Sequence, residues 1–160
     1  MRGALVAAAA LVLIGASCSR GGSGAAEVEL HAEPIDGQEC GACGMIVREQ
    51  SAARAQLVHR DGTRHFFCSI GDLLAYLEAP SPHGAVRATY VETLDPNADP
   101  REFEVAPRPW VPAESAHFVT GVAKPRVMGR PVLVFETAET ASAAATQYGG
   151  TVVPWRDLRL

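Results

Sequence analysis

The chain has 160 residues and a formal net charge of −4 at neutral pH, which allows one domain or two very small ones. No run of basic residues interrupts this mildly acidic sequence. Nucleic acid and the anionic headgroups of lipids are therefore not expected as partners.

The N-terminus has the features of an export signal. Arg2 precedes the apolar run 4–14, which carries no charge and is too short to span a bilayer. Small residues then lead to Cys18, as in a bacterial lipoprotein signal, although Gly15 stands where leucine is usual. The sequence therefore predicts acylation of Cys18 and attachment to a membrane on the extracytoplasmic side of the cell envelope. The alternative is ordinary cleavage nearby, which would discard Cys18 or leave it free.

These features divide the chain into three segments. Residues 1–17 are expected to be the signal peptide. Residues 18–33 contain a Gly- and Ser-rich stretch and are expected to form a lipid-attached flexible tether. Residues 34–160 are expected to form the folded domain.

Hydrophobic patterning predicts an alternation of strands and helices. The tether could contribute an edge strand at 27–33, and Ile46 with Val47 favours an extended backbone just after the first cysteines. Further along, the pattern predicts strands at 55–59, 63–67, 85–91, 110–119, 132–135 and 151–153, and helices at 72–77 and 137–148. The two halves repeat the order strands, helix, strand. We therefore expect an α+β domain of two ββαβ-like units with small antiparallel or mixed sheets.

Three specific signals support these boundaries. Asp61-Gly62 is typical of a hairpin turn between the strands that flank it. Ser69 with Asp72 three residues later resembles a capping box at the start of the first helix. Gly149 stands where a C-terminal cap glycine is expected for the second helix.

Three cysteines remain after Cys18, namely Cys40, Cys43 and Cys68. An odd number in an oxidising compartment argues against a purely structural disulfide scaffold. At least one of these thiols is therefore expected to be free or bound to a metal.

Cys43 and Met45 form the most informative pair. If they lie on the strand that Ile46 and Val47 favour, their side chains point to the same face. A thiolate and a thioether are soft donors that select Cu(I). Met128 lies in a loop punctuated by prolines, where a methionine is a poor candidate for the core, so it is a candidate third ligand. His117 is a weaker candidate.

Other interpretations of the cysteines remain open. Cys40, Cys43, His65 and Cys68 have a spacing that could hold zinc and would make this a zinc-stabilised structural or interaction domain. A thioredoxin-like redox centre would require a helix after the Cys-x-x-Cys motif, where the sequence favours a strand. A Cys40–Cys43 disulfide would close a very short loop and stabilise the fold little.

The order and spacing of several short motifs resemble those of the NosL family, accessory lipoproteins of nitrous-oxide reductase assembly. These motifs are Cys43-Gly44-Met45, Asp61-Gly62 through Phe66-Phe67, the helix at 73–77, Ala116 to Val119, Met128-Gly129-Arg130-Pro131 and the closing helix with Gly149-Gly150. The resemblance covers most of the chain after the signal peptide.

The resemblance implies an extracytoplasmic copper chaperone without catalytic turnover. Such a protein would carry Cu(I) to the copper centres of nitrous-oxide reductase, beside the membrane transporter complex of that system. It also implies two ββαβ units with a topology similar to one in organomercurial lyase. Carried onto this sequence, Cys43 and Met45 are the first ligand pair and Met128 the third. Cys40 and Cys68 are extra thiols that could join the site, form a disulfide or shift the preference toward zinc.

Overall fold

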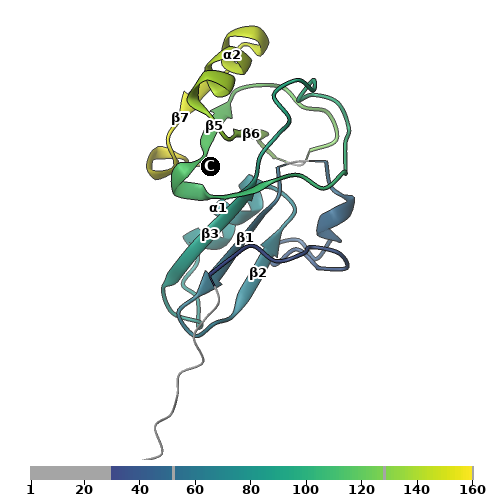
Figure 1. Ribbon diagram of the computed structural model, residues 1–160. Helices are drawn as coiled ribbons and strands as arrows, with labels where there is room; N and C mark the ends of the chain where they lie inside the picture. The colour runs from purple at the N-terminus through teal and green to yellow at the C-terminus, as the bar shows by residue number, and fades with distance from the viewer. Residues whose placement is uncertain (1–29, 52, 128, 160) are drawn as a thin grey trace, which may run out of the picture.

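The structure is a computed structural model that describes residues 30–51, 53–127 and 129–159 (Figure 1). The expected signal peptide, the lipid-attachment residue Cys18 and the candidate ligand Met128 lie outside these residues. Within the described part, no helix combines the length and the apolar character needed to cross a membrane.

Strands and two α-helices form most of the regular structure. The strands are β1 Ala55–His59, β2 Arg64–Phe67, β3 Val86–Glu92, β4 Trp110–Pro112, β5 His117–Thr120, β6 Val132–Phe135 and β7 Thr151–Val153. The α-helices are α1 Ile70–Glu78 and α2 Ala138–Tyr148, and the 3₁₀ helices are η1 Val47–Glu49, η2 Ala113–Ser115 and η3 Trp155–Asp157.

The strands form two antiparallel sheets of the same design. The first sheet has the order β2-β1-β3-β4 and the second has the order β6-β5-β7. In each sheet a hairpin is followed by a helix and then by a strand that returns to pair with the first strand of the hairpin (Figure 1). The prediction of an α+β fold built from two ββαβ units is therefore confirmed.

Local sequence signals explain where the elements begin and end. Asp61 accepts a hydrogen bond from the Thr63 amide at 2.9 Å, and Gly62 adopts a φ of 90° in the turn between β1 and β2. The Ser69 hydroxyl caps α1 by accepting from the Asp72 amide at 3.0 Å. Gly149 ends α2 in the left-handed conformation with a φ of 79°.

One hydrophobic core joins the two units. Leu57 and Phe67 of the first sheet belong to the same buried cluster as Phe118 and Val134 of the second sheet. A smaller cluster lies between the second sheet and α2. Because the main cluster contains residues from both sheets, we expect the two units to unfold together.

The first part of the described chain differs from the prediction. Residues 30–33 form no strand, so the described part of the expected edge strand is absent. Ile46 makes only an isolated bridge with Glu39, and Val47 begins η1 instead of continuing as a strand. Ile46 keeps an extended backbone, with φ −65° and ψ 119°, but Val47 is buried in the core as the first residue of η1.

A buried ion pair anchors the long connection between β3 and β4. Arg54 and Glu92 are both fully buried and form an ion pair through Arg54 Nε. The same guanidinium donates to the carbonyl oxygens of Arg48 at 3.1 Å, Val105 at 3.2 Å and Ala106 at 2.8 Å. Arg54 therefore joins the start of β1 to the loop before β4.

Replacing Arg54 with alanine is expected to destabilise the fold strongly. The substitution leaves the buried Glu92 carboxylate with only Arg48 Nη1, 3.9 Å away, and loss of the main partner of a buried pair typically costs about 3–5 kcal/mol. Arg156→Ala is the matched control, because Arg156 pairs with Asp157 at 3.6 Å on the surface and such pairs contribute at most about 1 kcal/mol. Urea unfolding of both variants measures the difference, and equal losses of stability would contradict this role of Arg54.

Candidate metal site

A tight turn brings the first two cysteines together. The Cys40 amide donates to the Met45 carbonyl at 2.8 Å, and the Gly44 amide donates to the Cys40 carbonyl at 2.8 Å. Gly44 has a φ of 74°, which residues with a side chain rarely adopt. The turn therefore depends on this glycine and holds Cys40 and Cys43 near each other.

The turn is fixed to the edge of the first sheet. The Gly41 amide donates to the Phe66 carbonyl at 2.8 Å, and Cys40 forms a parallel bridge with Phe66. Phe66 lies near the end of β2, just before Cys68. This backbone pairing places the turn beside the third cysteine.

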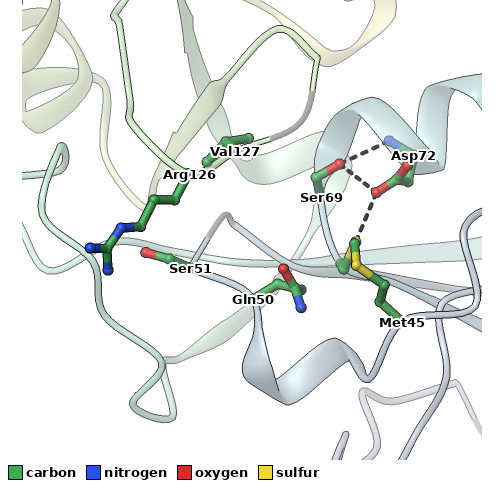
Figure 2. A pocket seen from close by; sticks show the side chains of 8 residues that line it. Met45, Gln50, Ser51, Ser69, Asp72, Arg126 and Val127 are labelled. Carbon is green, nitrogen blue, oxygen red and sulfur yellow. Dashed lines mark hydrogen bonds between the residues drawn. The ribbon is translucent and has the colours of Figure 1, made fainter.

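Cys68 connects β2 to α1 and lies next to the first turn of that helix. Its thiol donates a hydrogen bond to Asp72 Oδ2 at 2.9 Å. The Ser69 hydroxyl donates to the same oxygen at 2.8 Å. The capping arrangement of α1, in which Ser69 bonds to Asp72 (Figure 2), therefore also orients the Asp72 carboxylate toward the Cys68 thiol.

Three thiols and one carboxylate converge at this point. The ligand atoms of Cys40, Cys43, Cys68 and Asp72 all lie within 4.8 Å of one another. Cys43 Sγ and Cys68 Sγ are 3.5 Å apart. Cys40 and Cys68 are buried, whereas Cys43 is exposed. All three thiols are free, so the structure forms no Cys40–Cys43 disulfide.

The hydrogen bonds distribute the protons of this cluster unequally. The Cys68 thiol and the amides of Cys68, Ala42 and Cys43 lower the pKa of Cys40 to about 5, against the opposing effect of burial. The neighbouring acceptors Cys40 and Asp72, together with burial, raise the pKa of Cys68 because they stabilise its protonated thiol. Burial also raises the pKa of Cys43. At neutral pH the metal-free cluster therefore holds one thiolate, at Cys40.

A small pocket adjoins the cysteines and brings distant segments together. Its lining residues are Met45, Gln50, Ser51, Cys68, Ser69, Asp72, Arg126 and Val127 (Figure 2). Met45 and Cys68 thus share one pocket, although 23 positions separate them in the sequence. Arg126 and Val127, from the loop between β5 and β6, line the same pocket.

The structure places several of the predicted ligands differently from what the sequence predicts. Cys43 and Met45 do not share a strand face, because residues 41–43 form a turn. His117 begins β5 opposite Phe135 in the second sheet and is not part of the cysteine cluster. His65 is also outside this cluster, in which Asp72 takes the fourth position of the proposed zinc set.

Sequence reasoning missed Asp72 as a donor. It was recognised only as a partner in the cap of α1, a role that the structure confirms. The available signal was the spacing Cys68-x-x-x-Asp72 across a strand-to-helix junction, since the first helical turn folds the carboxylate back toward the preceding residue.

The donor set defines the metals that this site can accept. Thiolates are soft ligands that suit Cu(I) and zinc and bind hard cations poorly. The thioether of Met45 adds a further soft donor at the edge of the cluster, whereas Asp72 adds a harder one. The site is therefore suited to a soft or borderline metal ion, and the exposed Cys43 gives that ion access from solvent.

The fold and this site define an α+β domain with a cysteine-rich potential metal site. The model of the NosL family matches residues 31–160, and the chain belongs to the NosL family. The copper-binding lipoprotein NosL of Stutzerimonas stutzeri is 26% identical over 137 residues, which cover 82% of this chain and 69% of that protein.

The structural comparison agrees with this assignment. The crystal structure of the copper chaperone NosL from Shewanella denitrificans matches with a TM-score of 0.67 and 27% sequence identity. The match covers 81% of this chain and 96% of that one. The predicted family and fold are therefore confirmed.

The uneven proton distribution predicts a pH-dependent stability in the metal-free protein. The pKa of Cys40 falls from 9.0 to about 5 on folding, so between these values the unfolded chain binds a proton that the folded chain does not. The free energy of unfolding should therefore rise as the pH increases from about 5 to 9. Thiolate absorbance should show one ionised thiol per chain with a midpoint near pH 5.

Cys40→Ser is the matched variant for this measurement. It should remove the thiolate signal and flatten the dependence of unfolding free energy on pH in that range. A wild-type protein with no thiolate below pH 8, or an unchanged slope in Cys40→Ser, would show that Cys40 is not the ionised group.

Proposed function

We propose that this chain is a Cu(I)-binding chaperone that holds one ion at the cysteine cluster and passes it to a client protein. The convergence of three thiols within 4.8 Å, beside a methionine in the adjoining pocket, is the observation that carries this proposal. The names of its relatives, a copper-binding lipoprotein and a copper chaperone, support copper as the cargo.

The ligands divide into anionic and neutral donors. Cys43 is the exposed thiol and provides the point at which the ion enters and leaves. Met45 and Met128 supply neutral thioethers that a client can displace more easily than a thiolate. Cys40 is already ionised and can contribute a second thiolate, with Cys68 as a further donor. His117 lies in the second sheet and is the weakest candidate ligand.

Asp72 has a specific role during loading. Cys68 keeps its proton because its thiol donates to Asp72 and lies beside a second acceptor, the Cys40 thiolate. A metal ion at Cys40 removes one of these acceptors and lowers the pKa of the neighbouring thiol through its positive charge. The Asp72 carboxylate, 2.9 Å from Cys68 Sγ, is then the nearest acceptor for the released proton.

The sequence and the family also support a proposal for the location and the client. We propose that residues 1–17 are removed and that acylated Cys18 tethers the domain, through residues 18–33, to a membrane on the extracytoplasmic side. The client is nitrous-oxide reductase, and delivery takes place beside the membrane transporter complex of that system. In this proposal the protein transfers an ion without chemical turnover and needs no nucleic acid.

Anaerobic titration of the reduced protein with Cu(I), against a competing chelator, tests the copper site. One tightly bound ion per chain is expected. Cys43→Ser should weaken binding by at least about 100-fold. Loss of a side chain that binds the ion directly should reduce the affinity at least as much as loss of a residue that only positions a ligand. Met45→Leu should weaken it less, because the thioether is a neutral donor.

His65→Ala is the control, because His65 does not belong to the cluster. It should leave Cu(I) affinity unchanged. If Cys43→Ser binds Cu(I) as tightly as the wild type, the exposed thiol is not a ligand and the proposed transfer route is wrong.

Asp72 favours a second candidate function, a zinc-stabilised structural or interaction domain. A carboxylate is an acceptable zinc ligand, so Cys40, Cys43, Cys68 and Asp72 form a possible tetrahedral set. Structural zinc contributes folding free energy. Preferential Zn(II) binding, with unfolding when a chelator removes the ion, would support this function over copper transfer.

A further inference from the structure

The sulfur atoms of Cys43 and Cys68 lie close enough together to be joined with little movement. They are 3.5 Å apart, and all three cysteines of the cluster are free. A disulfide holds its sulfur atoms at about 2.05 Å, so an approach of about 1.5 Å would bond this pair. Cys43 and Cys68 therefore form a reduced dithiol that is arranged for oxidation.

The two members of this pair differ in their access to solvent. Cys43 is exposed in the turn at residues 41–43, whereas Cys68 is 4% exposed and lies between β2 and α1. A dissolved disulfide can reach the first sulfur but not the second. Redox-active cysteines commonly combine one accessible sulfur with a neighbouring thiol that completes the exchange. Cys43 can thus react with an outside reagent, and Cys68 can complete the reaction from inside the fold.

The surroundings of Cys68 supply an acceptor for its proton. Its thiol donates to Asp72 Oδ2 at 2.9 Å, and the Ser69 hydroxyl donates to the same oxygen at 2.8 Å. A thiol must lose its proton before its sulfur can attack a disulfide. A carboxylate within hydrogen-bond distance is placed to take that proton as a general base. The cap of α1 therefore prepares Cys68 for thiol–disulfide exchange.

We propose that Cys43 and Cys68 form a reversible disulfide, so that the cluster is a thiol–disulfide exchange centre whose redox state controls access to the metal site. The inference rests on the proposed function, because the proposed extracytoplasmic compartment is oxidising and the same sulfur atoms are donors to Cu(I) there. The oxidant is a dissolved disulfide compound, and the reductant is the corresponding thiol.

The exchange takes place in two balanced steps. The Cys43 thiol loses its proton to solvent, and its sulfur attacks the disulfide R–S–S–R, which forms a mixed disulfide and releases one thiolate, RS⁻. Cys68 then transfers its proton to Asp72 while its sulfur attacks Cys43 Sγ, which forms the Cys43–Cys68 bond and releases the second RS⁻. The two released thiolates take up the two protons. Two protein thiols are thus oxidised, and one disulfide is reduced to two thiols.

Cys40 is the competing partner, and the structure disfavours it. The Cys40 sulfur accepts a hydrogen bond from the Cys68 amide at 3.5 Å, and a disulfide at Cys40 would give up the negative charge that this amide stabilises. A Cys40–Cys43 bond would also close a very short loop, whereas Cys43 and Cys68 are 25 positions apart. The longer loop stabilises the fold more in the chain-entropy model. Because exchange is reversible, the more stable pairing accumulates.

Formation of the disulfide changes the metal site. It removes the exposed thiol through which the ion is proposed to enter and one buried donor, and it leaves Cys40 as the remaining thiol of the cluster. The thiolate is the form of cysteine that binds metals, so the oxidised cluster should bind Cu(I) poorly. By thermodynamic linkage, bound Cu(I) should favour the reduced form by the same factor.

Oxidation of the full chain by glutathione disulfide, followed by peptide mapping without reduction, tests the proposal. The protein is first reduced, freed of metal with a chelator and then equilibrated with mixtures of reduced and oxidised glutathione. Trypsin releases Cys18 and Cys68 on separate peptides and leaves Cys40 and Cys43 on a third, residues 21–48. The expected product is a cross-link between this third peptide and the peptide that carries Cys68.

Two substitutions identify the bonded pair. Cys40→Ser should still form the cross-link, because Cys40 is not a member of the pair. Cys43→Ser should prevent it, and this exposed substitution should leave the fold intact. Urea unfolding provides an independent readout. The oxidised wild type should unfold at a higher urea concentration than the reduced wild type, whereas glutathione disulfide should not shift the midpoint of Cys43→Ser.

Cu(I) titration of the two isolated forms separates this inference from the proposed function. The oxidised protein should bind Cu(I) at least about 100-fold more weakly than the reduced protein, because two donors are lost. If the disulfide forms but the reduced protein does not bind Cu(I), the copper function is wrong and the exchange centre stands. If the reduced protein binds Cu(I) and no cross-link forms, the exchange centre is wrong and the copper function stands.

Three results of the mapping would overturn the proposal. The first is that both thiols remain reduced in excess glutathione disulfide. The second is a stable mixed disulfide at Cys43, which would show an accessible thiol that Cys68 does not reach. The third is a cross-link that persists in Cys43→Ser or disappears in Cys40→Ser, because either result would make Cys40 a member of the bonded pair.

Discussion

The pairing of the Cys40–Met45 turn with the end of β2 is the constraint on which the site depends. One backbone hydrogen bond, from Gly41 to Phe66 at 2.8 Å, brings the turn to the junction where β2 gives way to α1. Cys68 lies at that junction and Asp72 in the first turn of the helix. The same cap that starts α1 therefore supplies the carboxylate of the metal site, so folding of the helix and assembly of the donors are coupled.

The fold was largely predictable because it rests on local signals. Asp61-Gly62, the Ser69 cap and Gly149 mark boundaries that the structure confirms, and the repeated order of strands and helices indicates two similar units. The strand expected at Ile46 and Val47 was wrong because the extended backbone ends at Ile46, which makes an isolated bridge with Glu39, and Val47 begins a 3₁₀ helix. Propensity describes a segment by itself, whereas this segment is shaped by the core beneath it.

The candidate site was predictable in its residue types but not in its geometry. The three cysteines stand out in the sequence, and the resemblance of Cys43-Gly44-Met45 and the accompanying motifs to the NosL family indicates copper. The Asp72 carboxylate is oriented by Cys68 and Ser69, which are only four and three residues away. The position of Met45 in the pocket of Cys68 instead depends on contacts between segments 23 residues apart. Such long-range contacts leave no periodic signal in a single sequence.

The distribution of protons explains how one small domain can hold donors of opposite character. At the cysteine cluster, amides and a thiol stabilise the Cys40 thiolate, so a negative charge is already present for a soft cation. Cys68, buried beside that thiolate and beside Asp72, keeps its proton, so charged and neutral sulfur donors lie side by side. The preference for a soft ion comes from these sulfur atoms, because negative charge alone would attract a divalent ion at least as strongly as a monovalent one.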